Sequence, residues 1–241
     1  MRNLLITVLL LSCFTAYSQE AQDTKIIVRT RAKDAKFIGS SMGGSMIVIR
    51  DAQTDEILAK GLTEGGTGNT DAIMKTNHER YTPIAFGAAA FEAHLSLQKP
   101  LFVTIEALSP VNHESKVAAS TQIWLIPGKN IDGEGLILEI PGFVVDGLYP
   151  QTHQGFSIEK DKSVELKANI VMMCGCTISE GGLWDSNDME VEAAVYVDGE
   201  FWKTIAMQIA GENTFTAQLN LEKAGNHEVI ISAYHKISKN T

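Results

Sequence analysis

The stretch Val164-Glu-Leu-Lys-Ala-Asn-Ile170 alternates apolar and polar residues without interruption. A period of two predicts a β-strand with one buried and one exposed face. The same alternation recurs at residues 91–97 and 215–221, and the strand-like stretches are separated by turns rich in glycine and polar residues. Strands and helices do not alternate along the chain, so the sequence predicts an all-β fold of antiparallel sheets.

The alternation, continued beyond residue 170, places Met172, Cys174 and Cys176 on one face of the strand. In extended chain the two cysteine Cα atoms would lie roughly 6.5–7 Å apart, at the upper edge of what a disulfide tolerates. Gly175 stands between them and relaxes the backbone, so a kink there would close the short ring. Geometry alone leaves the state of the pair open.

Three interpretations of this cysteine pair follow. The cysteines are buried apolar residues without chemistry, or they form a Cys174–Cys176 disulfide that suits thiol exchange. In the third interpretation they hold a soft metal together with Met172 or Met173, and with His153 as a further ligand. Thiolate and thioether together select Cu(I), so copper is the one cofactor suggested. Zinc would need four nitrogen or sulfur ligands, and the local sequence offers only two good ones.

The N-terminus has the pattern of an export signal. Arg2 precedes a short apolar segment, Leu4–Leu11, and Ala16-Tyr17-Ser18 supplies small residues at the usual cleavage spacing. We therefore expect a signal peptide over residues 1–18 and a periplasmic or secreted protein. Cys13 also resembles the cysteine of a bacterial lipobox, which gives a membrane-anchored lipoprotein as the alternative.

Cleavage after residue 18 leaves Cys174 and Cys176 as the only cysteines. Extracytoplasmic compartments are usually oxidising, so the pair is expected to be bridged, metal-bound or buried. No later segment is long and apolar enough to span a membrane. The formal net charge is −9, and removal of Arg2 makes it more negative. This balance argues against nucleic acid or an anionic membrane as partner.

The length of the chain indicates two modules rather than one small sandwich. We expect a β-sandwich domain over residues 24–142, a linker over 143–158 and a second β-sandwich domain over 159–241. Within the second, Asp198-Gly199 is a strong signal for a two-residue hairpin turn.

An internal repeat supports two copies of one plan. Residues 91–97 and 101–107 are predicted to form a hairpin, and residues 215–221 and 229–233 to form its counterpart. Side chains match between them, including Phe91 with Phe215, and Ala107 with Ala233 after a two-residue insertion. In this alignment Ile38 and Ser40 stand near the places of Cys174 and Cys176, so the thiols belong to one copy only.

In composition and hairpin rhythm both modules resemble the immunoglobulin-like or transthyretin-like sandwiches common in exported bacterial proteins. The resemblance covers most of residues 24–241 and implies a fold class: two tandem immunoglobulin-like antiparallel β-sandwich domains. It implies no functional residues, because unrelated functions share this fold.

Other motifs indicate less. Gly39-Ser-Ser-Met-Gly43 matches a nucleophile elbow formally, but that motif needs a helix after it and a strand-like run follows here. Trp184 is expected to cover the sandwich core. The acidic residues beside it form a weak calcium candidate without the spacing of an EF-hand loop. They are Asp185, Asn187, Asp188 and Glu190.

We therefore expect an exported, non-catalytic binding protein with a candidate Cu(I) site in its second module. One alternative is a structural or adhesive protein that recognises a protein or glycan through loops and holds no metal. The other is thiol–disulfide exchange through Cys174 and Cys176. No histidine stands out as a general base, and sequence order alone indicates no nucleophile–base pair, so an enzyme of another kind is not expected.

Overall fold

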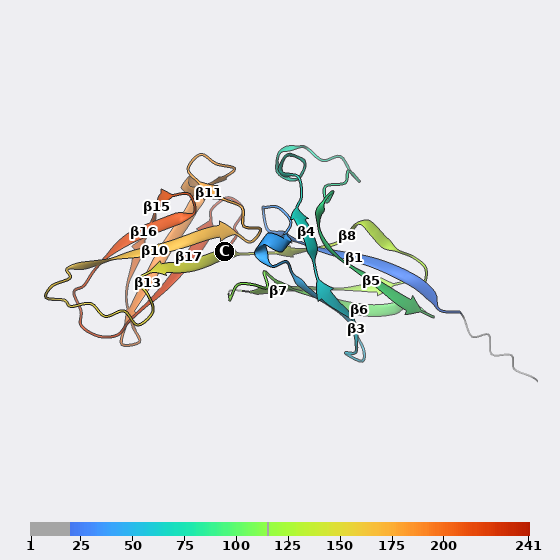
Figure 1. Ribbon diagram of the computed structural model, residues 1–241, viewed down its shortest axis with the longest axis horizontal. Coiled ribbons are helices and arrows are strands. Elements are labelled where there is room, and N and C mark those ends of the chain that lie inside the picture. The colour runs from blue at the N-terminus through green and yellow to red at the C-terminus, as the bar shows by residue number, and fades with distance from the viewer. Residues whose placement is uncertain (1–19, 115) are drawn as a thin grey trace, which may run out of the picture.

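The computed structural model describes residues 20–114 and 116–241 (Figure 1). Of these residues 56% lie in strands and 5% in helices, and most strand pairs are antiparallel, so the predicted all-β class is confirmed. The expected signal peptide and Cys13 lie outside the described residues. No helix in the described ranges has the length and apolar character that a membrane crossing requires.

The N-terminal half, residues 20–140, contains two four-stranded sheets with the orders β4-β5-β1-β8 and β3-β2-β6-β7. Among the strand pairs described in this half, the β1–β8 pair alone is parallel. Two short helical turns, η1 (Ser40–Met42) and η2 (Asp71–Lys75), lie in the connections. The strands are β1 (Gln22–Ala32), β2 (Met46–Asp51), β3 (Ile57–Leu62), β4 (Glu64–Thr67), β5 (Ala88–Leu97), β6 (Leu101–Ser109), β7 (Val117–Leu125) and β8 (Ile131–Ile140).

The C-terminal half, residues 143–241, contains a four-stranded sheet, β15-β16-β10-β9, a three-stranded sheet, β14-β13-β17, and the short pair β11-β12. A helical turn, η3 (Ser186–Asp188), precedes β13. The strands are β9 (Phe143–Tyr149), β10 (Ser163–Met172), β11 (Ile178–Ser179), β12 (Trp184–Asp185), β13 (Met189–Val197), β14 (Glu200–Ala206), β15 (Gln208–Gly211), β16 (Thr214–Asn220) and β17 (His227–His235). The two halves lie end to end, with the C-terminus between them (Figure 1).

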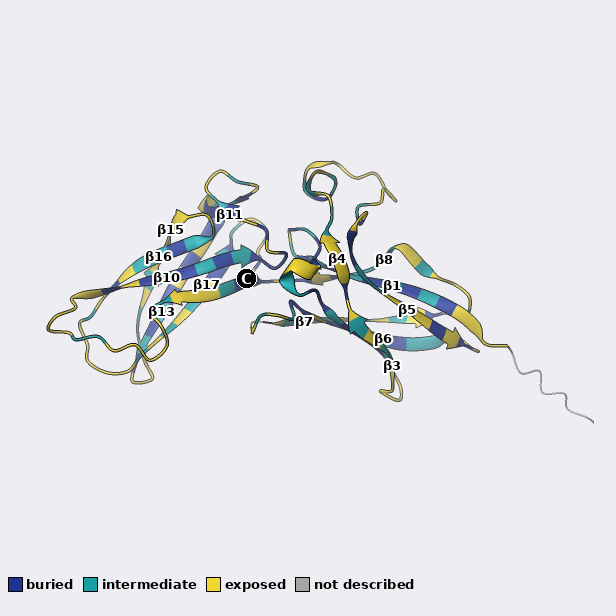
Figure 2. Ribbon diagram, in the orientation of Figure 1, coloured by how far each residue is buried: buried dark blue, intermediate teal, exposed yellow. Residues whose placement is uncertain are grey.

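Alternating burial along the central strands explains the two-layered halves. In β10 every second residue from Val164 to Met172 is buried, while the residues between them stay at least partly exposed (Figure 2). β1 follows the same pattern from Thr24 to Ala32. Apolar surface removed from water contributes roughly 25 cal/mol per Å². The inward faces of facing sheets therefore hold each half together.

The strand pairings of the two halves match. β1 pairs with β5 as β10 pairs with β16, and β2 pairs with β6 as β13 pairs with β17. The equivalent opposed residues are Ile26–Ala93 and Leu166–Ala217 in one sheet, and Ile49–Ile105 and Ala193–Ile231 in the other. The side chains matched in the sequence repeat therefore occupy matching positions.

The hairpins predicted for residues 91–107 and 215–233 are wrong. β5 and β6 belong to different sheets, and so do β16 and β17. Each connection carries the chain from one layer to the other. The alternating pattern shows which side chains of a strand are buried. It does not show whether the next strand pairs within the same sheet or crosses to the facing sheet, because the pattern is the same in both cases.

The expected linker over 143–158 is wrong in its first part, because residues 143–149 form β9 and pair antiparallel with β10. The direct connection between the halves is Pro141-Gly142, between β8 and β9. By contrast, the hairpin predicted at Asp198-Gly199 is confirmed: β13 and β14 pair across it, and both turn residues have positive φ, 52° and 86°. That conformation matches a type I′ turn.

Candidate functional site at the junction of the two halves

The cysteine pair lies in a turn beyond the end of β10. Gly175 N–H donates to Met172 O at 2.7 Å, and Met172 N–H donates to Cys176 O at 3.2 Å. Gly175 has a φ of 74°, so the extended chain ends before it. The predicted alternation through residue 176 therefore fails at this kink. The cysteine Cα atoms lie 5.3 Å apart, closer than in a strand, and a disulfide joins Cys174 to Cys176.

The N-terminal half contains an equivalent turn at the end of β1. Ala35 N–H donates to Ala32 O at 3.0 Å, and Ala32 N–H donates to Lys36 O at 2.9 Å. The hydrogen bonds correspond residue by residue to those of the cysteine turn. Cys174 and Cys176 are therefore equivalent to Asp34 and Lys36, and the alignment with Ile38 and Ser40 is wrong by four residues.

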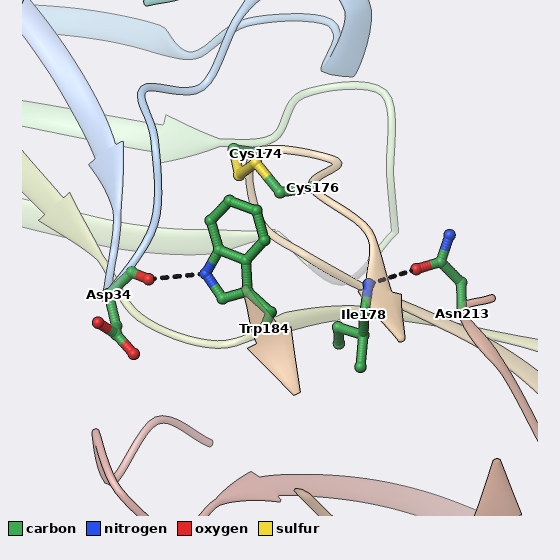
Figure 3. The surroundings of a disulfide bond; sticks show 6 residues. All are labelled: Asp34, Cys174, Cys176, Ile178, Trp184 and Asn213. Carbon is green, nitrogen blue, oxygen red and sulfur yellow. Dashed lines mark hydrogen bonds between the residues drawn. A yellow bond between two sulfur atoms is a disulfide. The ribbon is translucent and has the colours of Figure 1, made fainter. Parts of the chain in front are cut away.

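These two turns approach each other at the junction, and Trp184 connects them. Its indole Nε1–H donates to Asp34 O at 2.9 Å, across 150 residues of sequence (Figure 3). The ring lies beside the disulfide and is 9% exposed. β12, which carries Trp184, pairs with β11, and Ile178 of β11 donates its N–H to Asn213 Oδ1 at 2.7 Å. Trp184 therefore covers a junction between halves and not one sandwich core alone.

A methionine from the N-terminal half also reaches the cysteine turn. Met42, the last residue of η1, packs its sulfur against the backbone of Gly175. The contact is so close that a Cβ atom placed on Gly175 would lie 2.6 Å from Met42 Sδ. Met172 and Met173 are both about 1% exposed. The methyl group of Met173 packs against Gly142 at the connection between halves. Met42 is therefore the methionine that the structure brings beside the turn from outside it.

A pocket of about 430 Å³ opens at this place. Residues of both halves line it, and the only formal charge among them belongs to Lys36. The disulfide, Leu183 and Trp184 contribute its apolar lining. The lining residues are Lys36, Ser41, Thr67, Cys174, Gly175, Cys176, Thr177, Leu183 and Trp184. The volume is in the range of small-ligand sites.

His153, the predicted additional ligand, lies far from the cysteines. It belongs to the loop between β9 and β10, before Ser163, whereas the cysteines follow Met172 at the other end of β10. A ten-residue strand spans about 30 Å. His153 is therefore no part of this site.

The calcium candidates do not converge on one point. Asp185 Oδ1 accepts hydrogen bonds from the backbone N–H groups of Asn187, at 2.9 Å, and Gly181, at 3.1 Å. Asp185 therefore caps η3, and Glu190 points outward from β13. Across residues 20–114 and 116–241, no three His, Cys, Asp or Glu side chains gather as metal ligands would.

We expect Asp185 to make stability depend on acid pH. The hydrogen bonds from Asn187 and then Gly181 lower the pKa of its carboxyl below the ordinary 3.8. A lowered folded-state pKa stabilises the fold above pH 3.8, and the stabilisation is lost as pH falls through the folded-state pKa. The Asp185→Ser variant keeps an acceptor without this titration, so its unfolding midpoint should fall less between pH 7 and pH 3. The variant Glu190→Gln is the control, and equal slopes for Asp185→Ser and the unmodified protein would contradict the assignment.

Further contacts hold the junction. Asn240 is fully buried and accepts from Gly142 N–H at 2.7 Å while donating to Gly142 O at 3.0 Å. Lys33 Nζ donates to Lys239 O at 2.9 Å. His235, which is 8% exposed, hydrogen-bonds Ser238 Oγ at 2.7 Å and lies 3.8 Å from Asp34 Oδ2. Apart from Ser238, which lies three residues after His235, the partners in these contacts are far apart in sequence, so no local motif could indicate the contacts between the halves.

Comparison with protein-family models gives no match for this chain, and comparison with curated protein sequences gives none either.

Proposed function

We propose that this chain is an exported, non-catalytic binding protein of two immunoglobulin-like modules, and that the junction between them is its ligand site. In this proposal residues 1–18 are the export signal, with a lipid anchor at Cys13 as the alternative. The matching strand pairings of the two halves support the two-module description. The pocket lined from both halves supports the position of the site.

The ligand that fits the junction best is Cu(I), bound when the cysteine pair is reduced. The observation that carries this assignment is the position of Met42 Sδ beside Gly175, between the two cysteines in sequence. Reduction of the disulfide takes up two electrons and two protons from a dithiol reductant and yields two thiols. Their thiolates and the Met42 thioether form a soft donor set, which favours Cu(I) over Zn²⁺. The oxidised pair offers no thiolate, so metal binding and the disulfide exclude each other.

Copper binding should therefore follow the redox state of the pair. We expect the reduced mature protein to hold one Cu(I) per chain in anaerobic competition with a chromophoric Cu(I) chelator, and the oxidised protein to hold none. The Cys174→Ser/Cys176→Ser double variant should lose binding in both states. Met42→Leu should weaken it about ten-fold, which corresponds to about 1.4 kcal/mol.

Met46→Leu is the matched control, because Met46 lies on β2 opposite the partly exposed Leu62 and Leu108, away from the cysteine turn. Two results would reject the copper proposal: tight Cu(I) binding that survives the double cysteine variant, or reduced protein that takes up no copper.

Thiol–disulfide exchange is the second candidate, because the disulfide lines an open pocket. The cysteines are only 3% and 7% exposed, so a small thiol has better access than a protein thiol. A reactive pair requires a thiolate near neutral pH. After mild reduction, alkylation by iodoacetamide at pH 7 within minutes would favour exchange, and thiols that stay unmodified for hours would exclude it.

A further inference from the structure

The two walls of the junction pocket differ in chemistry. The N-terminal half contributes Lys36, Ser41 and Thr67, each with a polar group on its side chain. The apolar lining, which consists of the disulfide, Leu183 and Trp184, belongs to the C-terminal half. A molecule that occupies the pocket therefore meets hydroxyl and ammonium groups on one side and apolar groups on the other.

Lys36 supplies the charge of the polar wall. It is partly buried, and no ion pair within the described residues involves it. The acidic residue nearest to it in sequence, Asp34, has its Oδ2 3.8 Å from Nδ1 of His235, in the C-terminal half. The whole chain has a formal net charge of −9, so the charge in the pocket is opposite in sign to that of the protein. A cation in a pocket lined by no acidic residue favours an anionic ligand.

Hydrogen bonds between segments hold the polar wall in place. Phe37 N–H donates to Thr67 O at 3.3 Å, and the Phe37 side chain is fully buried. Gly65 N–H of β4 donates to Ser40 Oγ at 3.0 Å, which attaches η1 to the same strand. Lys36, η1 and the end of β4 are therefore fixed relative to one another. A wall that is ordered before the ligand arrives loses less entropy on binding.

On the opposite wall Leu183 is the exposed apolar side chain. It is 46% exposed, whereas Trp184 and the two cysteines are buried. The indole N–H of Trp184 already donates to Asp34 O, so the ring offers apolar surface and no free donor (Figure 3). Asp185, the acidic residue next to it, accepts from Gly181 N–H within its own loop. A ligand that covers Leu183 removes apolar surface from water, which stabilises the complex.

We propose that the oxidised protein binds a small organic anion in this pocket, with the carboxylate or sulfonate group of the ligand at Lys36 and its apolar body against Leu183 and the disulfide. A hydrogen bond between an ammonium and a carboxylate is stronger than one between neutral groups, so Lys36 orients the ligand. The volume of about 430 Å³ suits a small molecule. This inference rests on the part of the proposed function that makes the junction the ligand site, and not on copper.

Isothermal titration calorimetry of the oxidised mature protein tests the proposal, with naphthoate as the probe and the neutral naphthamide as its isostere. We expect the amide to bind about ten-fold more weakly, because a hydrogen bond to a charged group contributes more than one to a neutral group. Lys36→Met should lower the affinity for naphthoate to that for naphthamide and leave the affinity for naphthamide unchanged. Lys167→Met is the matched control, because Lys167 is also partly buried but lies on β10 and does not line the pocket.

A second variant tests the apolar wall. Leu183→Ala should weaken the binding of naphthoate and naphthamide by the same factor, about three-fold, because both ligands lose the same apolar contact. Leu148→Ala is its control, since Leu148 is 41% exposed on β9 and does not line the pocket. We expect this control to change neither affinity.

Three results would overturn the proposal: naphthoate that binds no more tightly than naphthamide, an unchanged affinity for naphthoate in Lys36→Met, or no binding of naphthoate at millimolar concentration. The copper assignment is tested separately, on the reduced protein. Cu(I) uptake without naphthoate binding rejects this inference alone, and naphthoate binding without Cu(I) uptake rejects the copper assignment alone. If neither ligand binds, the junction is not the ligand site and the proposed function fails with the inference.

Discussion

Replacement of Trp184 by alanine should lower the free energy of unfolding by about 3–5 kcal/mol, the usual cost of removing a buried tryptophan side chain. Trp184 is 9% exposed, lies beside the disulfide and hydrogen-bonds Asp34 O from the other half. Alanine would leave a void next to the existing pocket and an unsatisfied carbonyl at the junction. Urea denaturation followed by circular dichroism measures the change.

Trp124→Ala is the matched control for this prediction. Trp124 is 60% exposed on β7, and its ring lies beside the ring of Phe102, with the two ring centroids 5.0 Å apart. Loss of one exposed aromatic pair costs about 1 kcal/mol. If Trp184→Ala destabilised the protein no more than Trp124→Ala, the junction would not contribute to folding as we describe. A second transition in the Trp184→Ala denaturation curve would show instead that the halves then unfold separately.

The sequence predicts the strands well because burial by alternate residues is a local property. Val164–Met172 is predicted and found as a strand with one buried face, and Asp198-Gly199 is predicted and found as a hairpin turn. Both signals depend on residues close in sequence. Residues 143–149 escape the same analysis because Gly147 and Pro150 resemble linker composition, although Phe143 and Val144 are buried in β9.

The candidate site is less predictable because residues distant in sequence build it. The pair Cys174 and Cys176 is visible in the sequence, but Met42, Asp34 and Lys36 reach it from the end of β1 and from η1. Only the register of the two turns shows that Asp34 and Lys36 occupy the places of the cysteines. The sequence does contain a signal for this equivalence: the turn with Asp34 and Lys36 directly follows β1, and the turn with the two cysteines directly follows β10. An alignment of those strands by their buried residues would have identified it.

Replacement of Asn240 by alanine should destabilise the protein by about 2–4 kcal/mol, although the residue stands next to the last position of the sequence. Its side chain makes two hydrogen bonds to the backbone of Gly142, and both residues are buried. A buried backbone group that loses its partner costs about 1–3 kcal/mol. Gly142 has a φ of 103°, and the methyl group of Met173 lies against it, so the connection has little freedom to turn its polar groups toward water.

Asn130→Ala provides the comparison, because Asn130 also accepts a hydrogen bond from a backbone N–H, that of Lys25, but at an exposed position. An exposed group exchanges its partner for water, so this variant should lose about 1 kcal/mol or less. Urea denaturation measures both changes. Small-angle scattering of Asn240→Ala should in addition show a wider distribution of distances, since Asn240 fixes the backbone that joins the two halves. Equal stability of Asn240→Ala and Asn130→Ala, with unchanged scattering, would mean that the packing around Trp184 alone holds the junction.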